Sequence, residues 1–220
     1  MKRIAMLNLN YLMIRPYLKQ YLLLIAFALV FGIAFQNTTY PGMMAIVMLI
    51  NLGVYPFMLE EKAQGDILYA TLSVRRRDVV VGRYLFGLLL LIPGFLLVFS
   101  PLALSLLTGG PAEVAEVAGM ALAMVVVALL FNAIQFPAFF KMGYAKARYI
   151  VFVPMIFFAA LFIVIWKIVP NDMLAPFIAW LDALPTQSLL FLGAALVAVV
   201  FLLYVISGVI ACRFYSARDL

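Results

Sequence analysis

Six long runs of apolar residues leave this chain few ways to fold. A helix needs about 20 residues to cross the hydrocarbon core of a bilayer, and each run approaches or exceeds that length. The chain is 68% hydrophobic and 11% charged, whereas a soluble domain is about 45–50% apolar and about 25% charged. The sequence therefore predicts an all-α integral membrane protein, with residues 1–220 forming one transmembrane domain. The six expected spans are 18–36, 43–59, 84–107, 113–136, 148–168 and 187–211.

The basic residues fall almost entirely on one side of this predicted topology. Fourteen of the fifteen Lys and Arg residues lie on the side of the two chain ends, and Lys167 lies toward the other. Because positive residues concentrate in cytoplasmic loops, we expect a multi-pass protein of the cell (cytoplasmic) membrane with both termini cytoplasmic. Attraction to anionic membrane lipids also explains the net charge of +6 without nucleic acid as a partner.

Residues 1–17 predict an amphipathic helix ahead of the first span. Pro16 favours a break between this helix and the span. Asn10 belongs to the polar residues of the segment, which we expect to face the lipid headgroups. The apolar positions recur at helical spacing and are Ile4, Leu7, Tyr11, Ile14 and Leu18.

A second amphipathic segment is predicted at 170–185, where it would lie on the outer surface or re-enter the membrane. Inside the predicted spans, charged residues are essentially absent and polar residues are few. Asn51, Asn132 and Gln135 are the notable ones. Hydrogen bonding between helices is a common use of such residues, and a position along a transport pathway is the alternative.

The residues that most enzyme chemistry requires are missing from this sequence. It contains no histidine, which is the commonest general base and metal ligand. It also contains no Gly-x-x-x-x-Gly-Lys-Ser/Thr phosphate loop. We therefore expect no catalytic residue, no metal site and no cofactor in this chain, and an intramembrane enzyme is disfavoured. Active transport would need a partner ATPase that binds ATP and Mg.

The longest interruption of apolar sequence runs from 60 to 83. It holds four of the nine acidic and five of the fifteen basic residues. Acidic residues at the end of a helix oppose its dipole, so Glu60 and Glu61 favour the first turn of a new helix. A short charged helix between two spans is a firm lever that a partner can reach. We therefore predict a cytoplasmic coupling helix over residues 60–72.

Two loops resemble those of a known transporter family. The first contains Glu-Glu-Lys-x-x-Gly at 60–65, Leu-x-Val-x-Arg at 72–76 and Gly-Arg-Tyr at 82–84. The second contains Phe136-Pro137, Phe140-Lys141, Gly143-Tyr144 and Lys146-Ala147-Arg148. With the six-span plan and the closing Tyr215-x-x-Arg218-Asp219, the chain resembles ABC-2-type exporter permeases, in particular the permease subunits of phenol-soluble modulin exporters. Ser73 departs from the pattern, which has proline at this position.

The resemblance implies a permease that forms a homodimer or heterodimer and docks on a separate cytoplasmic ABC ATPase. ATP-driven closure of the ATPase pair would move the spans and export an amphipathic or hydrophobic cargo, such as a peptide, toxin or antimicrobial compound. The implied coupling residues are Glu60, Glu61, Lys62, Gly65, Asp66 and Arg76. The implied second-loop residues are Lys141, Gly143, Tyr144 and Arg148. The alternative function is a non-transporting membrane scaffold that recruits a cytoplasmic partner through its charged loops.

Overall fold

Helices account for nearly all of the chain that the structure describes. The computed structural model describes residues 2–34, 39–63, 74–103, 114–168, 175–176, 179–180 and 183–217, and no strand occurs within these ranges. The first half contains α1 (Lys2–Ile14), a 3-10 turn (Arg15–Tyr17), α2 (Leu18–Ala34), α3 (Thr39–Lys62), α5 (Arg76–Leu89) and α6 (Leu91–Val98). The second half contains α8 (Val114–Met142), α9 (Tyr144–Ala147), a 3-10 turn (Arg148–Val151), α10 (Phe152–Ile168) and α12 (Thr186–Ser216).

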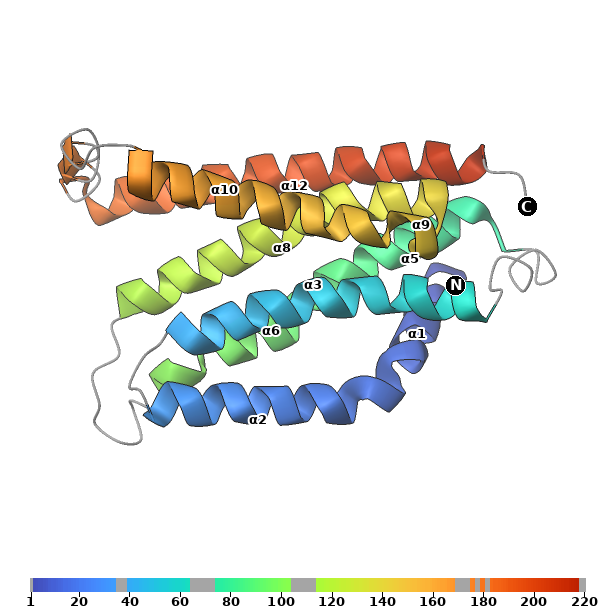
Figure 1. The fold of residues 1–220 in the computed structure, drawn as a ribbon, viewed down its shortest axis with the longest axis horizontal. Helices are drawn as coiled ribbons and strands as arrows, with labels where there is room; N and C mark the ends of the chain where they lie inside the picture. The colour runs from blue at the N-terminus through green and yellow to red at the C-terminus, as the bar shows by residue number, and fades with distance from the viewer. Residues whose placement is uncertain are drawn as a thin grey trace.

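The long helices lie side by side and alternate in direction (Figure 1). Both chain ends, the end of α3, the start of α5 and the short helix α9 are found at the same end of the bundle. We call this the basic end, because exposed Lys and Arg side chains gather there. Its described basic residues include Lys62, Arg75, Lys141, Arg148 and Arg213.

Four of the described helices are long and apolar enough to cross a membrane. They cover Pro41–Lys62, Arg76–Ala103, Val114–Met142 and Gln187–Ser216. Helices α2 and α10 are parallel to these four in Figure 1, but each has only 17 described residues. The prediction of an all-helical, multi-pass membrane protein is therefore confirmed, while a total of six spans stays a prediction.

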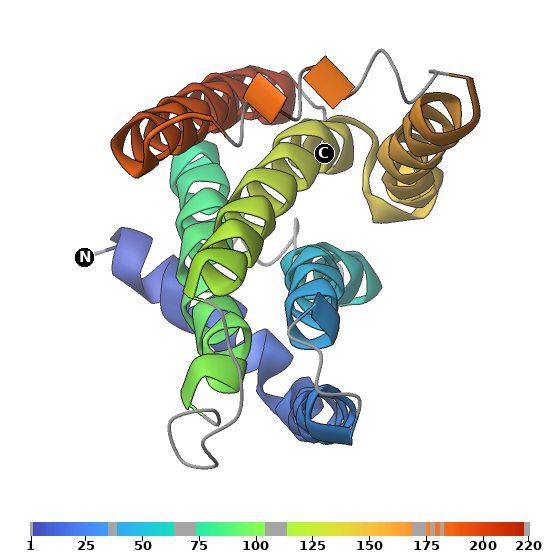
Figure 2. The same ribbon diagram turned by 90° about the vertical axis from the view of Figure 1, so that its left-hand side faces the viewer.

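Helix α8 passes through the middle of the bundle, with α3, α5 and α12 packed around it (Figure 2). Helices α2 and α10 lie at the edges. The core at the basic end is aromatic, and Phe57 of α3 is at its centre. The Phe57 ring centroid lies 5.2 Å from that of Phe136, 5.1 Å from that of Phe139 and 5.0 Å from that of Phe140. Such contacts add stability beyond the area they bury, so this core holds α3 firmly against α8.

The span Arg76–Ala103 is broken near its middle. Helix α5 ends at Leu89 and α6 begins at Leu91, with Pro93 close behind. Proline has no N–H group, and its ring clashes with the carbonyl four residues earlier, here that of Leu89. The break therefore follows directly from the proline.

Helix α1 packs on α5 and α3. Among its described side chains, Met6, Asn10 and Ile14 are buried, whereas Tyr11 is 52% exposed. The prediction that Asn10 faces the lipid headgroups is therefore wrong. Asn10 can be buried because its amide nitrogen donates to the Gly82 carbonyl oxygen at 3.2 Å and its oxygen accepts from Arg83, and a satisfied polar group costs little to bury.

A chain of hydroxyl groups links α5, α8 and α12. The Ser207 hydroxyl donates to the Ala133 carbonyl oxygen at 2.6 Å and therefore accepts from the Tyr84 hydroxyl at 2.7 Å. The Tyr204 hydroxyl donates to the Tyr84 carbonyl oxygen at 2.8 Å. Polar contacts of this kind hold transmembrane helices together where lipid provides no hydrophobic driving force.

Replacing Ser207 by alanine removes both of its bonds and leaves the buried Tyr84 hydroxyl without this partner. We expect Ser207→Ala to lower the free energy of unfolding by about 1 kcal/mol, measured by titrating the protein in mixed micelles with dodecyl sulfate. Ser216→Ala is the matched control, because the exposed Ser216 hydroxyl donates to the Cys212 carbonyl oxygen of its own helix and links no second helix in the described part of the chain. Equal losses in the two variants would contradict a stabilising role for the Ser207 link.

Candidate functional site

A buried ion pair joins three helices at the basic end. Arg83 of α5 bonds the carboxylate of Glu60 on α3, and its side chain is only 1% exposed. The same guanidinium donates to the Asn10 side-chain oxygen at 2.5 Å and to the Pro56 carbonyl oxygen at 3.1 Å. It also lies over the Phe57 ring, 5.0 Å from the centroid. A charge taken out of water needs such compensation, and here α1 and α3 provide it.

This pair corrects two sequence predictions. Residues 60–83 do not form one exposed loop, because α3 continues to Lys62 and α5 already begins at Arg76. Glu60 and Glu61 therefore end a span instead of starting a new helix, and charged residues do occur within the spans. Glu60 is tolerated at this helix end because Arg83 neutralises it, and Lys62 beside it complements the helix dipole.

The second acidic residue, Glu61, joins the end of α3 to α9, which lies in the second predicted cytoplasmic loop. The Glu61 carboxylate accepts a hydrogen bond at 2.9 Å from the backbone N–H of Ala145, in the first turn of α9. Gly143, which separates α8 from α9, has φ 79°, a left-handed conformation that glycine adopts without steric cost. This turn directs α9 back toward the end of α3. The end of the second predicted span and the second loop therefore form one continuous surface.

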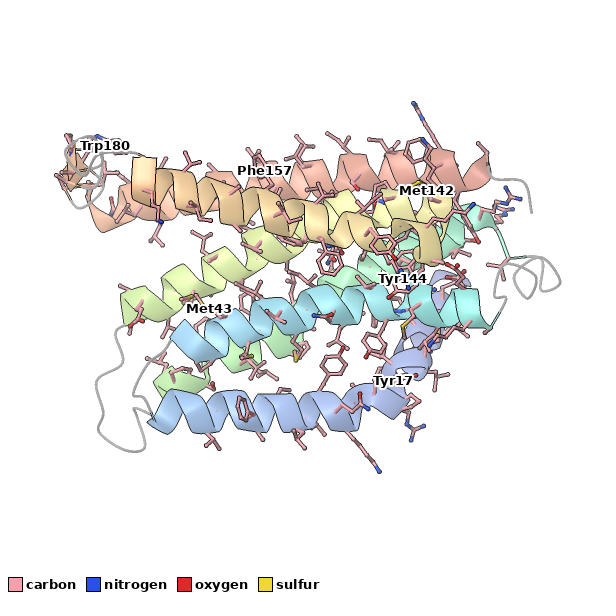
Figure 3. The ribbon with its side chains drawn as sticks, viewed as in Figure 1. Tyr17, Met43, Met142, Tyr144, Phe157 and Trp180 are labelled. Atoms are coloured by element: carbon pink, nitrogen blue, oxygen red, sulfur yellow. The ribbon has the colours of Figure 1, made fainter. Side chains whose placement is uncertain are left out.

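The remaining second-loop residues lie close to this contact. Figure 3 shows Tyr144 and Met142 at the basic end. The Tyr144 ring is half-buried, with its centroid 5.8 Å from that of Phe139. Lys141 is exposed, and its ammonium lies 5.0 Å from the Phe214 ring centroid. Arg148 is also exposed and donates to the Tyr149 hydroxyl at 2.7 Å.

Arg76 binds a different part of the bundle from Glu60 and Glu61. Its guanidinium donates to the carbonyl oxygens of Tyr215 at 3.1 Å and Ser216 at 2.9 Å, at the end of α12. These carbonyls belong to the last helical turn, where the backbone leaves acceptors unpaired and the dipole favours a cation. Arg76 therefore fastens the start of α5 to the end of α12.

The three polar residues predicted inside the spans have different surroundings. Asn51 is exposed and donates to the Val47 carbonyl oxygen of its own helix at 2.8 Å, and it bonds no second helix among the described residues. Asn132 is buried where α8 meets Gly53 of α3 and Gly87 of α5. Gln135 is completely buried, and neither of its amide atoms has a hydrogen-bond partner among the described residues.

Comparison with known proteins assigns the chain to a family. Residues 6–216 match the family model described as ABC-2 family transporter protein. The chain belongs to the ABC-2 transporter family. Searches of curated proteins and of solved structures gave no match. The predicted family is thus confirmed, whereas the closer likeness to phenol-soluble modulin exporters stays a prediction.

Family membership makes this ABC-2 protein the membrane component of a transporter and implies a partner ABC ATPase. Four of its candidate coupling residues, Glu60, Glu61, Lys62 and Arg76, lie within the described part of the chain. Gly65, Asp66 and the rest of the predicted coupling helix lie outside it, as does most of the 170–185 segment. Of these four, Glu60 is buried, Arg76 is half-buried, and Glu61 and Lys62 are exposed.

The sequence prediction missed the residues that hold this ABC-2 protein together at the basic end. Asn10 was expected at the membrane surface, and Arg83 was expected in a loop. Asn10 and Arg83 are 73 positions apart, so no local pattern could pair them. The sequence contains one weaker signal. Arg83 directly precedes a long apolar run, and if the helix begins before this residue, its guanidinium enters the bundle and needs a hydrogen-bond acceptor there.

Proposed function

We propose that this chain is the permease subunit of an ATP-driven exporter. A separate cytoplasmic ATPase binds ATP and Mg, and two permease copies, identical or different, form the transmembrane pathway in the cell membrane. The observation that carries the proposal is the bond from Ala145 N–H to the Glu61 carboxylate. It makes the end of α3 and the start of α9 one exposed surface on which an ATPase can push.

The distribution of charge supports the orientation in this proposal. In the described part of the chain, the basic residues of the α3–α5 and α8–α10 connections lie at the same end of the bundle as α1 and the end of α12 (Figure 1). Lys167, near the end of α10, lies toward the opposite end. Cytoplasmic loops of membrane proteins carry an excess of Lys and Arg. The basic end is therefore the side on which we place the ATPase.

The contacts at the end of α3 offer a mechanical route from that surface into the bundle. Helix α3 has 24 residues and continues through Pro56, so it is about 36 Å long. Glu61 links its end to α9, which follows α8, while Glu60 links it to α5 through Arg83. A displacement of the end of α3 therefore reaches three spans, which are α3 itself, α5 and, through α9, α8. The proposed coupling role of Glu60 is this internal link, and Glu61 and Lys62 are the residues exposed to the ATPase.

The polarity of the bundle supports an amphipathic or hydrophobic cargo, such as a peptide, toxin or antimicrobial compound. Among the described residues, the buried charges Glu60 and Arg83 neutralise each other. They leave no net charge with which to bind a hydrophilic ion. Asn132 and Gln135 contribute buried amide groups, which suit a polar backbone or headgroup better than a free ion.

The proposal is tested by reversing the charge at the exposed contact. We expect Glu61→Arg to lose its bond to Ala145 and to repel Lys62, reducing ATP-driven export by about 10-fold or more, as expected for a lost charge-assisted hydrogen bond. The measurement uses inside-out vesicles that contain the full chain and its ATPase, with uptake of a fluorescent amphipathic peptide and ATP hydrolysis recorded together.

Glu116→Arg is the matched control, because Glu116 is an exposed acid in the first turn of α8 at the opposite end of the bundle. It should retain export. Unchanged export in Glu61→Arg would contradict the coupling role of this surface. ATPase binding without any ATP-dependent peptide uptake would instead favour the membrane scaffold.

A further inference from the structure

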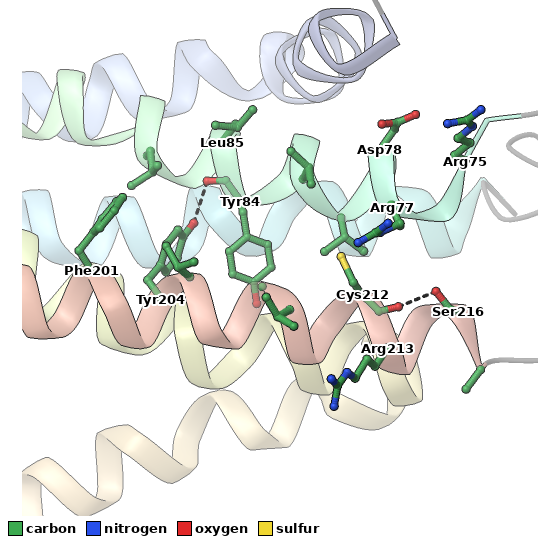
Figure 4. Close-up of a pocket in the computed structure, with 17 residues that line it drawn as sticks. Arg75, Arg77, Asp78, Tyr84, Leu85, Phe201, Tyr204, Cys212, Arg213 and Ser216 are labelled. Atoms are coloured by element: carbon green, nitrogen blue, oxygen red, sulfur yellow. Dashed lines mark hydrogen bonds between the residues drawn. The ribbon is translucent and has the colours of Figure 1, made fainter.

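A groove of about 1090 Å³ lies between α5 and α12 at the basic end (Figure 4). It is separate from the Glu60–Arg83 pair and from the surface formed by Glu61 and α9. Tyr84 and Tyr204 line it, with the Tyr204 hydroxyl bonded to the Tyr84 carbonyl. Cys212, the one cysteine of the sequence, also lines it.

The outer end of the groove is positively charged. Arg77 of α5 points between the two helices toward Cys212, while Arg75 at the start of α5 and Arg213 in the last turn of α12 lie at its rim (Figure 4). All three are exposed, and Asp78 is the one acidic residue among the described residues that line the groove. Arg76 is turned away and bonds the end of α12, which holds the two walls together. Three guanidinium groups against one carboxylate leave a net positive charge at this end.

The inner part of the groove is apolar. Its walls are Val81, Leu85 and Leu88 on α5 and Phe201, Val205 and Val209 on α12. Phe201 and Arg213 are twelve positions apart, or about 18 Å along the helix at a rise of 1.5 Å per residue. One leaflet contributes about 15 Å of hydrocarbon, half of a core about 30 Å thick. The groove therefore matches one leaflet in depth, with its charged end at the level of the headgroups.

We propose that this groove binds an anionic phospholipid of the leaflet at the basic end. Arginine side chains suit phosphate because their planar guanidinium donates two parallel hydrogen bonds, and basic pockets between transmembrane helices bind anionic headgroups. A free phosphate ion has no apolar group that could cover the apolar walls of the groove. A second copy of the chain, related by two-fold symmetry, would place like-charged arginines opposite one another. The proposal does not depend on the exporter function.

The test measures lipid binding to the purified full chain in detergent by native mass spectrometry. Phosphatidylglycerol is compared with phosphatidylcholine and with inorganic phosphate. We expect phosphatidylglycerol to bind more tightly than the other two. Each arginine near an anionic headgroup contributes about a five-fold effect, so Arg77→Gln combined with Arg213→Gln should weaken binding about 25-fold. The matched control is Arg15→Gln with Lys19→Gln, which removes two exposed positive charges at the same end and should bind as the unaltered chain does.

Cys212 provides a readout at the groove itself. Phosphatidylglycerol should slow alkylation of Cys212 by N-ethylmaleimide in the unaltered chain and in the control, and not in the Arg77/Arg213 variant. Rates with and without lipid are compared within each variant, because Arg77 lies beside the Cys212 thiol. Equal binding of the two lipids, an equal loss in the control, or binding that leaves Cys212 unprotected would overturn the proposal. A disulfide that links two copies through Cys212 would assign the groove to a contact between copies and overturn it as well.

Discussion

Replacing Glu60 by leucine is expected to cost about 3–5 kcal/mol of the free energy of unfolding, because it leaves the Arg83 charge buried without its carboxylate. Arginine cannot release its proton to escape this penalty. Asn10 and the Pro56 carbonyl remain as partners, but neither carries a negative charge. Because the free energy of unfolding of a protein is only about 5–15 kcal/mol, a large fraction of the Glu60→Leu molecules should fail to fold. Titration with dodecyl sulfate in mixed micelles measures the loss.

Two further variants separate the ion pair from general damage at the end of α3. Glu61→Leu changes the neighbouring exposed acid in the same way and should cost about 1 kcal/mol. The combined variant Glu60→Leu with Arg83→Met should be much more stable than Glu60→Leu alone, since an apolar pair of similar volume can replace a buried ion pair. If the combined variant lost as much stability as the sum of the losses in Glu60→Leu alone and in Arg83→Met alone, that result would argue against pairing.

Replacing Gly82 by alanine should displace α1 from α5 and cost about 1–3 kcal/mol. The added Cβ would lie 2.8 Å from the Met6 Cβ. A Cβ is fixed to its backbone, so the clash cannot be relieved by a change of rotamer and α1 must shift as a whole. That shift also strains the bonds from Asn10 to Gly82 and from Arg83 to Asn10. The predicted loss is measured in the same micelle titration, and faster trypsin cleavage at Arg15 would report the movement of α1.

Gly119→Ala is the control for this substitution. Gly119 is an exposed helical glycine of α8, and an added Cβ there would meet nothing within 4 Å. Alanine at such a position removes the entropic cost of glycine and should leave stability unchanged or raise it by about 0.5–1 kcal/mol. If both glycine variants lost the same stability, the close approach of α1 to α5 would not be the cause.

These two predictions concern the same structural unit. Asn10, Gly82, Arg83 and Glu60 tie α1, α3 and α5 together at the basic end. If the ATPase acts at the end of α3, the force reaches α5 and α1 through this unit. A variant that weakens it should therefore reduce export more than it reduces ATPase binding.

The positions of the helices were predictable because they follow from hydrophobicity alone. A run of apolar residues must be helical inside a bilayer, where every backbone group needs an internal partner. The predicted segment 113–136 corresponds to α8 (Val114–Met142), and 187–211 corresponds to α12 (Thr186–Ser216). The errors occur at the basic end, where α3, α5, α8 and α12 all extend beyond the predicted limits. A charged residue looks like a span boundary in the sequence, whether or not a partner in the fold neutralises it.

The sequence by itself determined the class of this protein, the family to which it belongs and the end of the bundle where its charges gather. Each of these depends on composition or on the order of residues along the chain. Only the tertiary structure decided that Glu60 faces inward while Glu61 faces α9, that Arg76 holds α12, and that Asn10 is buried. The physical reason is that a polar side chain is buried or exposed according to the partners it finds, and here those partners are distant in sequence.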